Sequence, residues 1–99
     1  MNVRWTKSAT RQWEETFEYI ETDNPIAARR IAESVFDVID ILAVHPHAGR
    51  LRKTKVTRQF AVPRLPYVIA YELDLPADIL WVVAVFDGRR RWPKSFPKE

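Results

Sequence analysis

An uninterrupted run of eight apolar residues, Ile79 to Phe86, constrains the fold of this chain more than any other segment. Successive side chains of a strand point to opposite faces of a sheet, so this run predicts a strand that is apolar on both faces and central in its sheet. Tyr67 to Leu73 alternates more clearly, and Asp74 to Asp78 between the two has the composition of a hairpin turn. Together they predict an antiparallel strand pair whose hydrophobic surface needs cover.

The first half of the chain predicts two helices to supply that cover. Asn2 to Trp5 reads as a short strand, and Thr6 after it is a good N-cap residue. Asn24 is a second preferred N-cap, and Pro25 suits the first helical position, so a helical hairpin with a short connection is expected. Apolar residues recur at helical spacing in both segments: Ala9, Trp13, Phe17 and Ile20 in the first, which ends near Thr22, and Ala27, Ile31, Val35, Val38 and Leu42 in the second.

The middle of the chain predicts a loop and two further strands. His45 to Gly49 is expected to end the second helix, while Arg50 to Lys53 and Thr57 to Val62 have strand-like composition. In the second strand Arg58 falls on the apolar face. A buried arginine without a partner is costly, so we expect Arg58 either to reach the margin of the sheet or to be paired.

The order of these elements predicts an α+β fold, because helices come first and strands follow. We expect an N-terminal strand and a helical hairpin packed on a mostly antiparallel sheet of four to five strands. A length of 99 residues suits one domain, residues 1–99, with a basic tail over residues 88–99. The composition, 46% hydrophobic and 29% charged, is that of a globular rather than a disordered chain.

What the sequence lacks disfavours several kinds of site. There is no cysteine for disulfides or thiolate chemistry, and no apolar run reaches the roughly 18–20 residues of a membrane-spanning helix. His45 and His47 are two residues apart, but no third histidine or nearby acid completes a ligand set, so we expect no metal and no other cofactor. No signal-peptide pattern follows Met1, and the expected location is the cytoplasm, with no membrane partner.

Charge is distributed unevenly along the chain. Residues 1–49 carry five basic and eight acidic side chains, residues 50–99 carry eleven basic and five acidic ones, and no acid occurs between Arg50 and Tyr71. A basic half on an acidic scaffold predicts a surface for a polyanion or an acidic protein partner. The alternative is a solvated basic face without a partner.

From Val3 to Phe96 the chain resembles the ParE/RelE superfamily of bacterial toxins from toxin–antitoxin pairs, and most of all its ParE branch. The resemblance rests on the order and spacing of short pieces of sequence. These are Trp5-Thr6 before a helix with Ala9, Asn24-Pro25 with Ala28, Leu42 with Pro46 and Gly49-Arg50, Thr57-Arg58 with Phe60 and Val62, Pro66 to Ile69 with Tyr71, and Val85 before Arg90 to Pro93.

The resemblance implies a small cytoplasmic toxin that a cognate antitoxin holds inactive and that meets operator DNA only through the antitoxin complex. ParE-like members inhibit DNA gyrase, whereas RelE-like members cut messenger RNA on the ribosome, and both share one fold. RelE-type nucleases carry an arginine after the tyrosine that corresponds to Tyr67, where this chain has Val68. They also tend to place a tyrosine or histidine near the C-terminus, but residues 87–99 have neither, and Asp87 stands where many ParE-like tails have histidine.

The chemistry of RNA cleavage favours the same branch. Metal-independent cleavage needs a base, an acid and charge stabilisation, and arginine is a poor proton shuttle because its pKa lies above about 12. Candidates for proton transfer are limited to Asp87, Glu72 and the two loop histidines. We therefore expect a non-enzymatic gyrase inhibitor. The alternative is a ribosome-dependent endoribonuclease with Arg58 and Arg90 as candidate catalytic residues.

Contacts with target and partner are predicted on the basic half. An antitoxin segment that orders on binding is expected on the apolar helical surface and the sheet margin, with acids that complement Arg50 to Arg64. In the tail, basic and aromatic residues together are typical of interfaces, although Trp92 and Phe96 could equally pin the tail onto the sheet. The predicted contact residues are Arg50, Arg52, Lys53, Arg58, Arg64, Arg89, Arg90, Arg91, Trp92 and Phe96.

Overall fold

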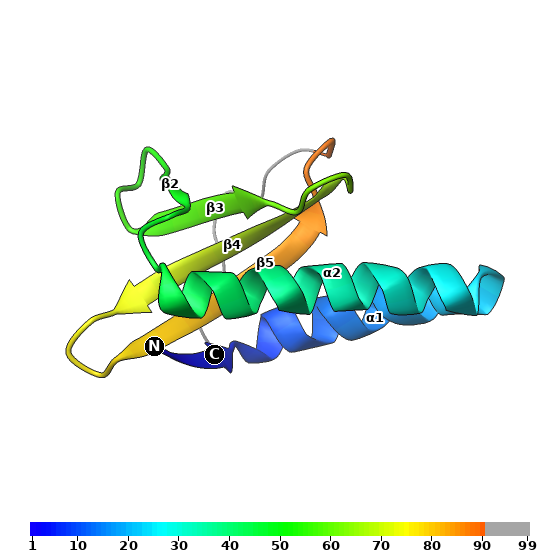
Figure 1. Ribbon diagram of the computed structural model, residues 1–99, viewed down its shortest axis with the longest axis horizontal. Helices are drawn as coiled ribbons and strands as arrows, with labels where there is room; N and C mark the ends of the chain where they lie inside the picture. The colour runs from blue at the N-terminus through cyan, green and yellow to red at the C-terminus, as the bar shows by residue number, and fades with distance from the viewer. Residues whose placement is uncertain (91–99) are drawn as a thin grey trace.

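The computed structural model describes residues 1–90 and has the predicted α+β architecture, two helices packed on a five-stranded sheet (Figure 1). Strand order in the sheet is β1-β5-β4-β3-β2. Among the described residues, no helix combines the length and apolar character needed to cross a membrane. The elements are β1 (Asn2–Trp5), α1 (Lys7–Asp23), α2 (Pro25–Val44), β2 (Arg50–Leu51), β3 (Thr57–Ala61), β4 (Tyr67–Asp74) and β5 (Ile79–Asp87).

Both helices begin at the predicted capping residues. The Thr6 hydroxyl accepts a hydrogen bond from the Ala9 amide at 3.1 Å, and the Asn24 side chain accepts one from the Ala27 amide at 3.0 Å. Asn24 also closes the first helix, because its own amide donates to the Ile20 carbonyl. One residue thus ends α1 and starts α2, which makes the hairpin tight.

β5 is an interior strand of the sheet, as the apolar run predicts, with β1 on one side and β4 on the other. It pairs antiparallel with β4 and parallel with β1, and the Met1 amino group donates to the Ala43 carbonyl at 2.7 Å, so the chain start is tied to the end of α2. The predicted strand from Arg50 to Lys53 is too long. β2 stops at Leu51 because the chain then turns: the Arg52 amide donates to the Thr57 carbonyl, and the Lys55 amide donates back to the Arg52 carbonyl.

A β-bulge in β5 changes which residues face the helices. Ala70 pairs with Ala84 and Tyr71 with Val82, which leaves Val83 as an extra residue. Before the bulge Leu80 and Val82 face the helices, and after it Val85 does. Val83 and Ala84 therefore both point to the opposite face, and so does Phe86.

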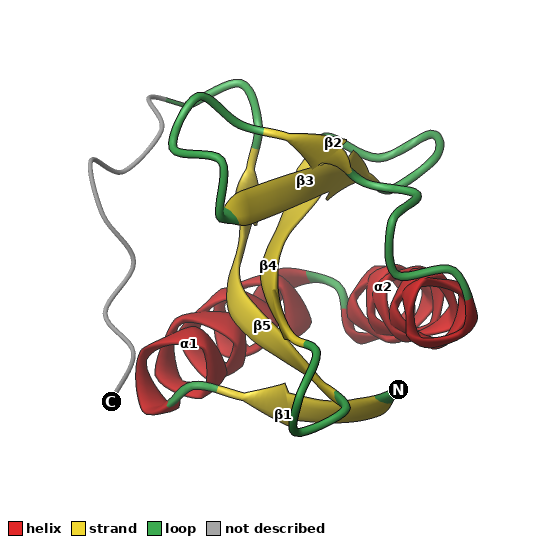
Figure 2. Cartoon of the chain, turned by 90° about the vertical axis from the view of Figure 1, so that its left-hand side faces the viewer, coloured by secondary structure: helices red, strands yellow, loops and turns green. Residues whose placement is uncertain are grey.

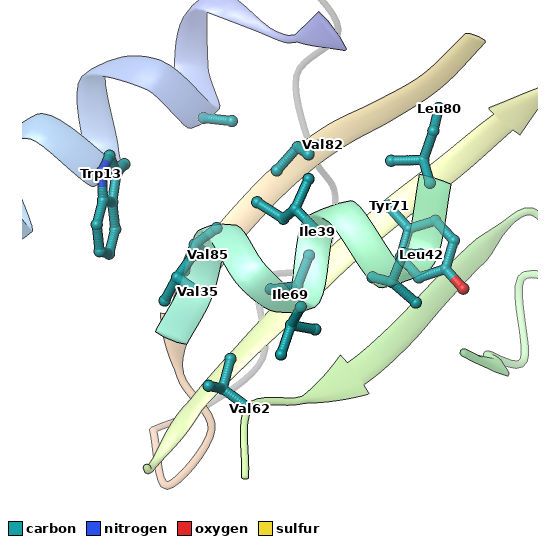
Figure 3. Close-up of a cluster of buried hydrophobic side chains, with 12 residues drawn as sticks. Trp13, Val35, Ile39, Leu42, Val62, Ile69, Tyr71, Leu80, Val82 and Val85 are labelled. Atoms are coloured by element: carbon teal, nitrogen blue, oxygen red, sulfur yellow. The ribbon is translucent and has the colours of Figure 1, made fainter. Parts of the chain in front are cut away.

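The main core lies between the helices and one face of the twisted sheet (Figures 2 and 3). Side chains of β4 and β5 form the sheet side of this core, and Ala9 and Trp13 of α1 together with residues of α2 form its helix side. The Trp13 ring meets the Phe36 ring edge-on, with centroids 6.2 Å apart. Side chains shown in Figure 3 include Val35, Ile39, Leu42, Val62, Ile69, Tyr71, Leu80, Val82 and Val85.

Candidate functional site

One basic surface lies at the end of the sheet where β3 and β5 end and β4 begins (Figure 1). The Gly88 amide donates to the Pro66 carbonyl at 2.7 Å, which holds the exit of β5 against the turn between β3 and β4. Arg64 is exposed in that turn, and Arg89 and Arg90 are exposed just after β5. We call Arg64, Arg89 and Arg90 the distal basic surface.

Within this surface Asp87 is held by Arg89. The Arg89 amide and Nε donate to Asp87 Oδ1 at 2.9 and 3.0 Å, and Nη2 donates to Oδ2 at 2.7 Å. These hydrogen bonds from Arg89 lower the pKa of Asp87 from 3.8 to about 2. The carboxylate is therefore ionised and occupied near neutral pH, which makes it a poor proton donor and a weak base.

A groove of about 700 Å³ separates the distal basic surface from α1. Arg89 and Arg90 line this groove together with Glu15 and the exposed Tyr19 of α1, and Tyr67 of β4 also belongs to its lining. The pKa of Tyr67 is raised, first by burial and then by the negative charge of Asp87. The phenol is thus protonated and available as a hydrogen-bond donor at neutral pH.

A second basic surface lies at the sheet edge formed by β2. Arg50, Arg52 and Lys53 line a groove of about 440 Å³ together with Leu51 and Gln59. β2 is the last strand in the sheet order, and it has only two residues. An edge of this kind offers backbone hydrogen-bonding groups as well as positive charge.

Arg58 belongs to neither surface, because its guanidinium reaches under the loop between α2 and β2. Nη1 donates to the Gly49 carbonyl at 2.9 Å and to the His47 carbonyl at 3.4 Å. Tyr71 of β4 binds the same loop: its hydroxyl accepts a hydrogen bond from the Gly49 amide at 2.8 Å and donates one to the Pro46 carbonyl at 2.7 Å. The expected pairing of Arg58 is confirmed, and its partners are backbone carbonyls.

Comparison with known proteins decides the family. The family model described as "ParE toxin of type II toxin-antitoxin system, parDE" matches residues 3–92. This chain belongs to the ParE toxin family. It is 35% identical over 92 residues to the protein named "Putative toxin Y4kP" of Sinorhizobium fredii (strain NBRC 101917 / NGR234), a match that covers 93% of each chain.

The fold of this ParE-family toxin also matches a solved structure. The structure described as "Chromosomal ParDE TA system from P. aeruginosa" superposes with a TM-score of 0.73 over 88% of this chain and 95% of the other. Sequence identity is 14%, so the likeness supports the fold alone. The predicted superfamily, its ParE branch and the fold class are thereby confirmed.

The predicted contact residues of the toxin divide into groups. Arg50, Arg52 and Lys53 come together at the β2 edge, Arg64, Arg89 and Arg90 at the distal end, and the half-buried Arg58 binds carbonyls of the loop after α2. The predictions for Arg91, Trp92 and Phe96 lie outside the described residues. Sequence reasoning missed Tyr19 and Tyr67, because only the packing of α1 beside β5, together with the pairing of β4 with β5, brings them to one groove.

Candidate proton-transfer groups are dispersed in the toxin. Glu72 accepts a hydrogen bond from the Thr57 hydroxyl at 2.9 Å, Asp87 is bound by Arg89, and His45 and His47 are exposed in the loop after α2. Within residues 1–90, no three His, Cys, Asp or Glu side chains gather closely enough to hold a metal ion. Val68, at the position where RelE-type nucleases carry arginine, packs against the apolar cluster on the far face of the sheet.

Proposed function

We propose that this ParE-family toxin arrests growth in the cytoplasm by binding and inhibiting DNA gyrase, and that a cognate antitoxin neutralises it. The family match over residues 3–92 carries the proposal. The distal basic surface supports a binding rather than a catalytic mode, because the carboxylate of Asp87 beside it is already paired with Arg89. Arg64 and Arg90 are then the residues we assign to the target contact.

A supercoiling assay with purified gyrase tests the target. We expect the toxin to inhibit supercoiling and to trap cleaved DNA, while transcripts in growth-arrested cells stay intact. Reversing the charge at the distal surface, Arg64→Glu with Arg90→Glu, should weaken inhibition at least tenfold. Lys7→Glu is the matched control, since Lys7 is exposed at the start of α1 and apart from this surface. Degradation of translating mRNA without any effect on gyrase would replace the proposal with the ribonuclease alternative.

For the antitoxin we propose contact with the β2 edge and the exposed apolar residues of α2. Val44 and Ile41 are 72% and 53% exposed one turn apart near the end of α2, and Leu51 of β2 is also exposed. A partner segment with apolar residues and acids would bury these side chains and pair with Arg50 and Lys53. Through that complex alone the toxin would meet operator DNA.

Binding kinetics of the co-expressed antitoxin test this surface. Charge steering mainly affects association, so Arg50→Glu with Lys53→Glu should slow association and flatten its dependence on salt. Ile41→Ser with Val44→Ser should instead speed dissociation. Lys7→Glu again serves as the control for charge. If the association rate changes neither with ionic strength nor with the β2 variants, the β2 edge is not the antitoxin contact.

A further inference from the structure

One stripe of α1 borders the groove beside the distal basic surface, which we call the α1 groove. The residues that line it from this helix are Gln12, Glu15, Thr16, Tyr19 and Ile20. Their spacing of three and four residues places them on one face of the helix, along about 12 Å of its axis. The groove therefore runs along α1, which lies beside β5 (Figure 2).

The dimensions of the α1 groove suit an extended chain. A volume of about 700 Å³ over that length leaves a cross-section of about 60 Å². A helix with its side chains is about 10–12 Å across, which is a cross-section of about 80–110 Å². An extended segment advances about 3.3 Å per residue, so about four residues fill the length of the groove.

Both walls of the groove belong to elements that the core fixes. Ala9 and Trp13 are buried and hold α1 against the sheet, while Tyr67 pairs with Asp87 in the ladder between β4 and β5. The Thr16 hydroxyl donates to the Gln12 carbonyl at 2.9 Å within the helix. A ligand therefore meets a largely preformed groove, which lowers the entropic cost of binding.

Hydrogen-bond donors lie on the strand side of the α1 groove. Burial first and the charge of Asp87 second raise the pKa of Tyr67, and the positive charges of Arg89 and Arg90 oppose them, so both guanidinium groups lie near the phenol. Arg89 is bound to Asp87. Within residues 1–90, the Tyr67 hydroxyl and the Arg90 guanidinium make no hydrogen bond or ion pair. A carboxylate or phosphate oxygen is the acceptor that suits these two donors.

The charge of α1 distinguishes between those two acceptors. Four glutamates are exposed on this helix: Glu14, Glu15, Glu18 and Glu21. A nucleic-acid backbone carries a negative charge at every nucleotide, so these glutamates would repel it along the groove. A protein segment can instead place one carboxylate at Tyr67 and Arg90 and continue with uncharged residues.

Apolar area for such a segment lies farther along α1. The Tyr19 ring is 83% exposed at the margin of the groove, and Ile20 is half-buried within its lining. Tyrosine rings are enriched at protein interfaces, because they combine a large contact area with a polar end. The groove thus offers donors on the strand side and apolar side chains on the helix side.

We propose that the α1 groove binds an extended segment of the target protein, with one carboxylate at Tyr67 and Arg90 and apolar side chains on Ile20 and the Tyr19 ring. This contact rests on the proposed function, because that function supplies the target. It extends the role of Arg90 from a charge on the distal basic surface to one end of a shaped groove.

Peptide binding to the full-length toxin tests the chemistry of the groove without any target. The probe is acetyl-Leu-Glu-Leu-Leu-amide, with acetyl-Leu-Gln-Leu-Leu-amide as the uncharged control and a thymidine tetranucleotide as the nucleic-acid alternative. In ¹⁵N NMR titrations we expect the glutamate peptide to shift the amide signals of Thr16, Tyr19 and Tyr67. It should bind at least about threefold more tightly than the glutamine peptide, and Tyr67→Phe should reduce that preference, because the phenol donates to the carboxylate.

Three results of these titrations would overturn the proposal. Equal affinity for the glutamate and glutamine peptides would remove the carboxylate contact. Shifts confined to residues outside the α1 groove would place the peptide elsewhere. Tighter binding of the tetranucleotide than of the glutamate peptide would assign the groove to nucleic acid.

A variant that fills the groove tests the contact with the target. Thr16→Trp places a large ring in the α1 groove and should weaken both the glutamate peptide and the inhibition of gyrase supercoiling at least about tenfold, because the ring occupies the space of the segment. Thr22→Trp is the matched control. Like Thr16, Thr22 donates its hydroxyl to the carbonyl four residues earlier, but it is exposed and is not part of the groove lining. Melting temperatures of both variants check that they fold.

The two assays separate the groove from the proposed function. If the wild type does not inhibit gyrase, the proposed target is wrong, and the peptide titrations still decide whether the groove binds an acidic, extended segment. If the wild type and Thr16→Trp inhibit gyrase equally, the groove is not the target contact. Loss of antitoxin binding in Thr16→Trp with unchanged inhibition of gyrase would assign the groove to the antitoxin.

Discussion

The hydroxyl of Tyr71 accepts a hydrogen bond from the amide of Gly49 at 2.8 Å, 22 residues earlier in the chain. The same hydroxyl donates to the Pro46 carbonyl, so a central strand holds the loop that follows α2. Gly49 is required there because a β-carbon would overlap the Tyr71 ring and hydroxyl. This contact sets the path by which the chain enters β2 and its basic groove.

Tyr71→Phe should therefore reduce the free energy of unfolding by about 1–3 kcal/mol, because the Gly49 amide and the Pro46 carbonyl lose their partner. Gly49→Ala should cost a similar amount through overlap, and the two effects should not add. Denaturant unfolding of the single and double variants measures both the losses and their coupling. Tyr19→Phe is the control, and a loss as large there as at Tyr71 would contradict the role of this hydrogen bond.

Asp87 should have a pKa well below that of an ordinary aspartate. Its pKa of about 2 lies below the ordinary 3.8, so its contribution to stability is fully present above about pH 4 and is lost as the pH falls through 2. Arg89→Gln should return the pKa toward 3.8, because the hydrogen bonds from Arg89 are its largest cause. Arg90→Gln, which removes only a weaker long-range charge, should shift it much less. A ¹³C carboxyl titration of the three proteins measures these values, and an Asp87 pKa near 3.8 in the wild type would refute the pairing.

Arg64 occupies the left-handed backbone region, with φ of 67°. Arg64→Gly removes the strain of the β-carbon but adds freedom to the unfolded chain, so the stability should stay within about 1 kcal/mol of the wild type. Arg64→Val should lose about 1–2 kcal/mol, because a β-branched side chain tolerates this conformation poorly. Thermal unfolding of the three proteins tests this ranking: Arg64→Gly should melt close to the wild type, and Arg64→Val should melt below both. If this ranking is observed, Arg64→Gly can be used to measure what the Arg64 side chain contributes to target binding, because the variant is as stable as the wild type.

The cap at Asn24 should be worth about 1 kcal/mol to the helical hairpin. Asn24→Ala removes the acceptor for the Ala27 amide, whereas Asn24→Asp keeps an oxygen there and adds a favourable charge at the start of α2. Thr22→Ala is a control, because the Thr22 hydroxyl only bonds back to the Glu18 carbonyl on an exposed face. In thermal unfolding, the melting temperature of Asn24→Asp should be close to or above that of the wild type, and that of Asn24→Ala should be below it. Equal losses in Asn24→Ala and Thr22→Ala would contradict the capping role.

Local signals in the sequence were sufficient for the elements and their order. Thr6 and Asn24 mark the helix starts because a side-chain oxygen that satisfies free amides acts within three residues. The run from Ile79 to Phe86 marks an interior strand because burial on both sides selects apolar residues at every position. The excess of basic residues after Gly49 likewise predicts a basic surface, because charged side chains stay in contact with water wherever the strands place them.

Tertiary structure alone decided how those elements form surfaces. Nothing local specifies that β1 runs parallel to β5, or that Val83 bulges, since both depend on strands that meet from distant parts of the chain. The basic residues of one stretch without acids, from Arg50 to Tyr71, lie in three places: the exposed β2 edge, the half-buried Arg58 under the loop after α2, and a distal turn. Sequence spacing determines what a residue's neighbours along the chain can do, whereas the face on which a side chain emerges depends on register, which long-range pairing sets.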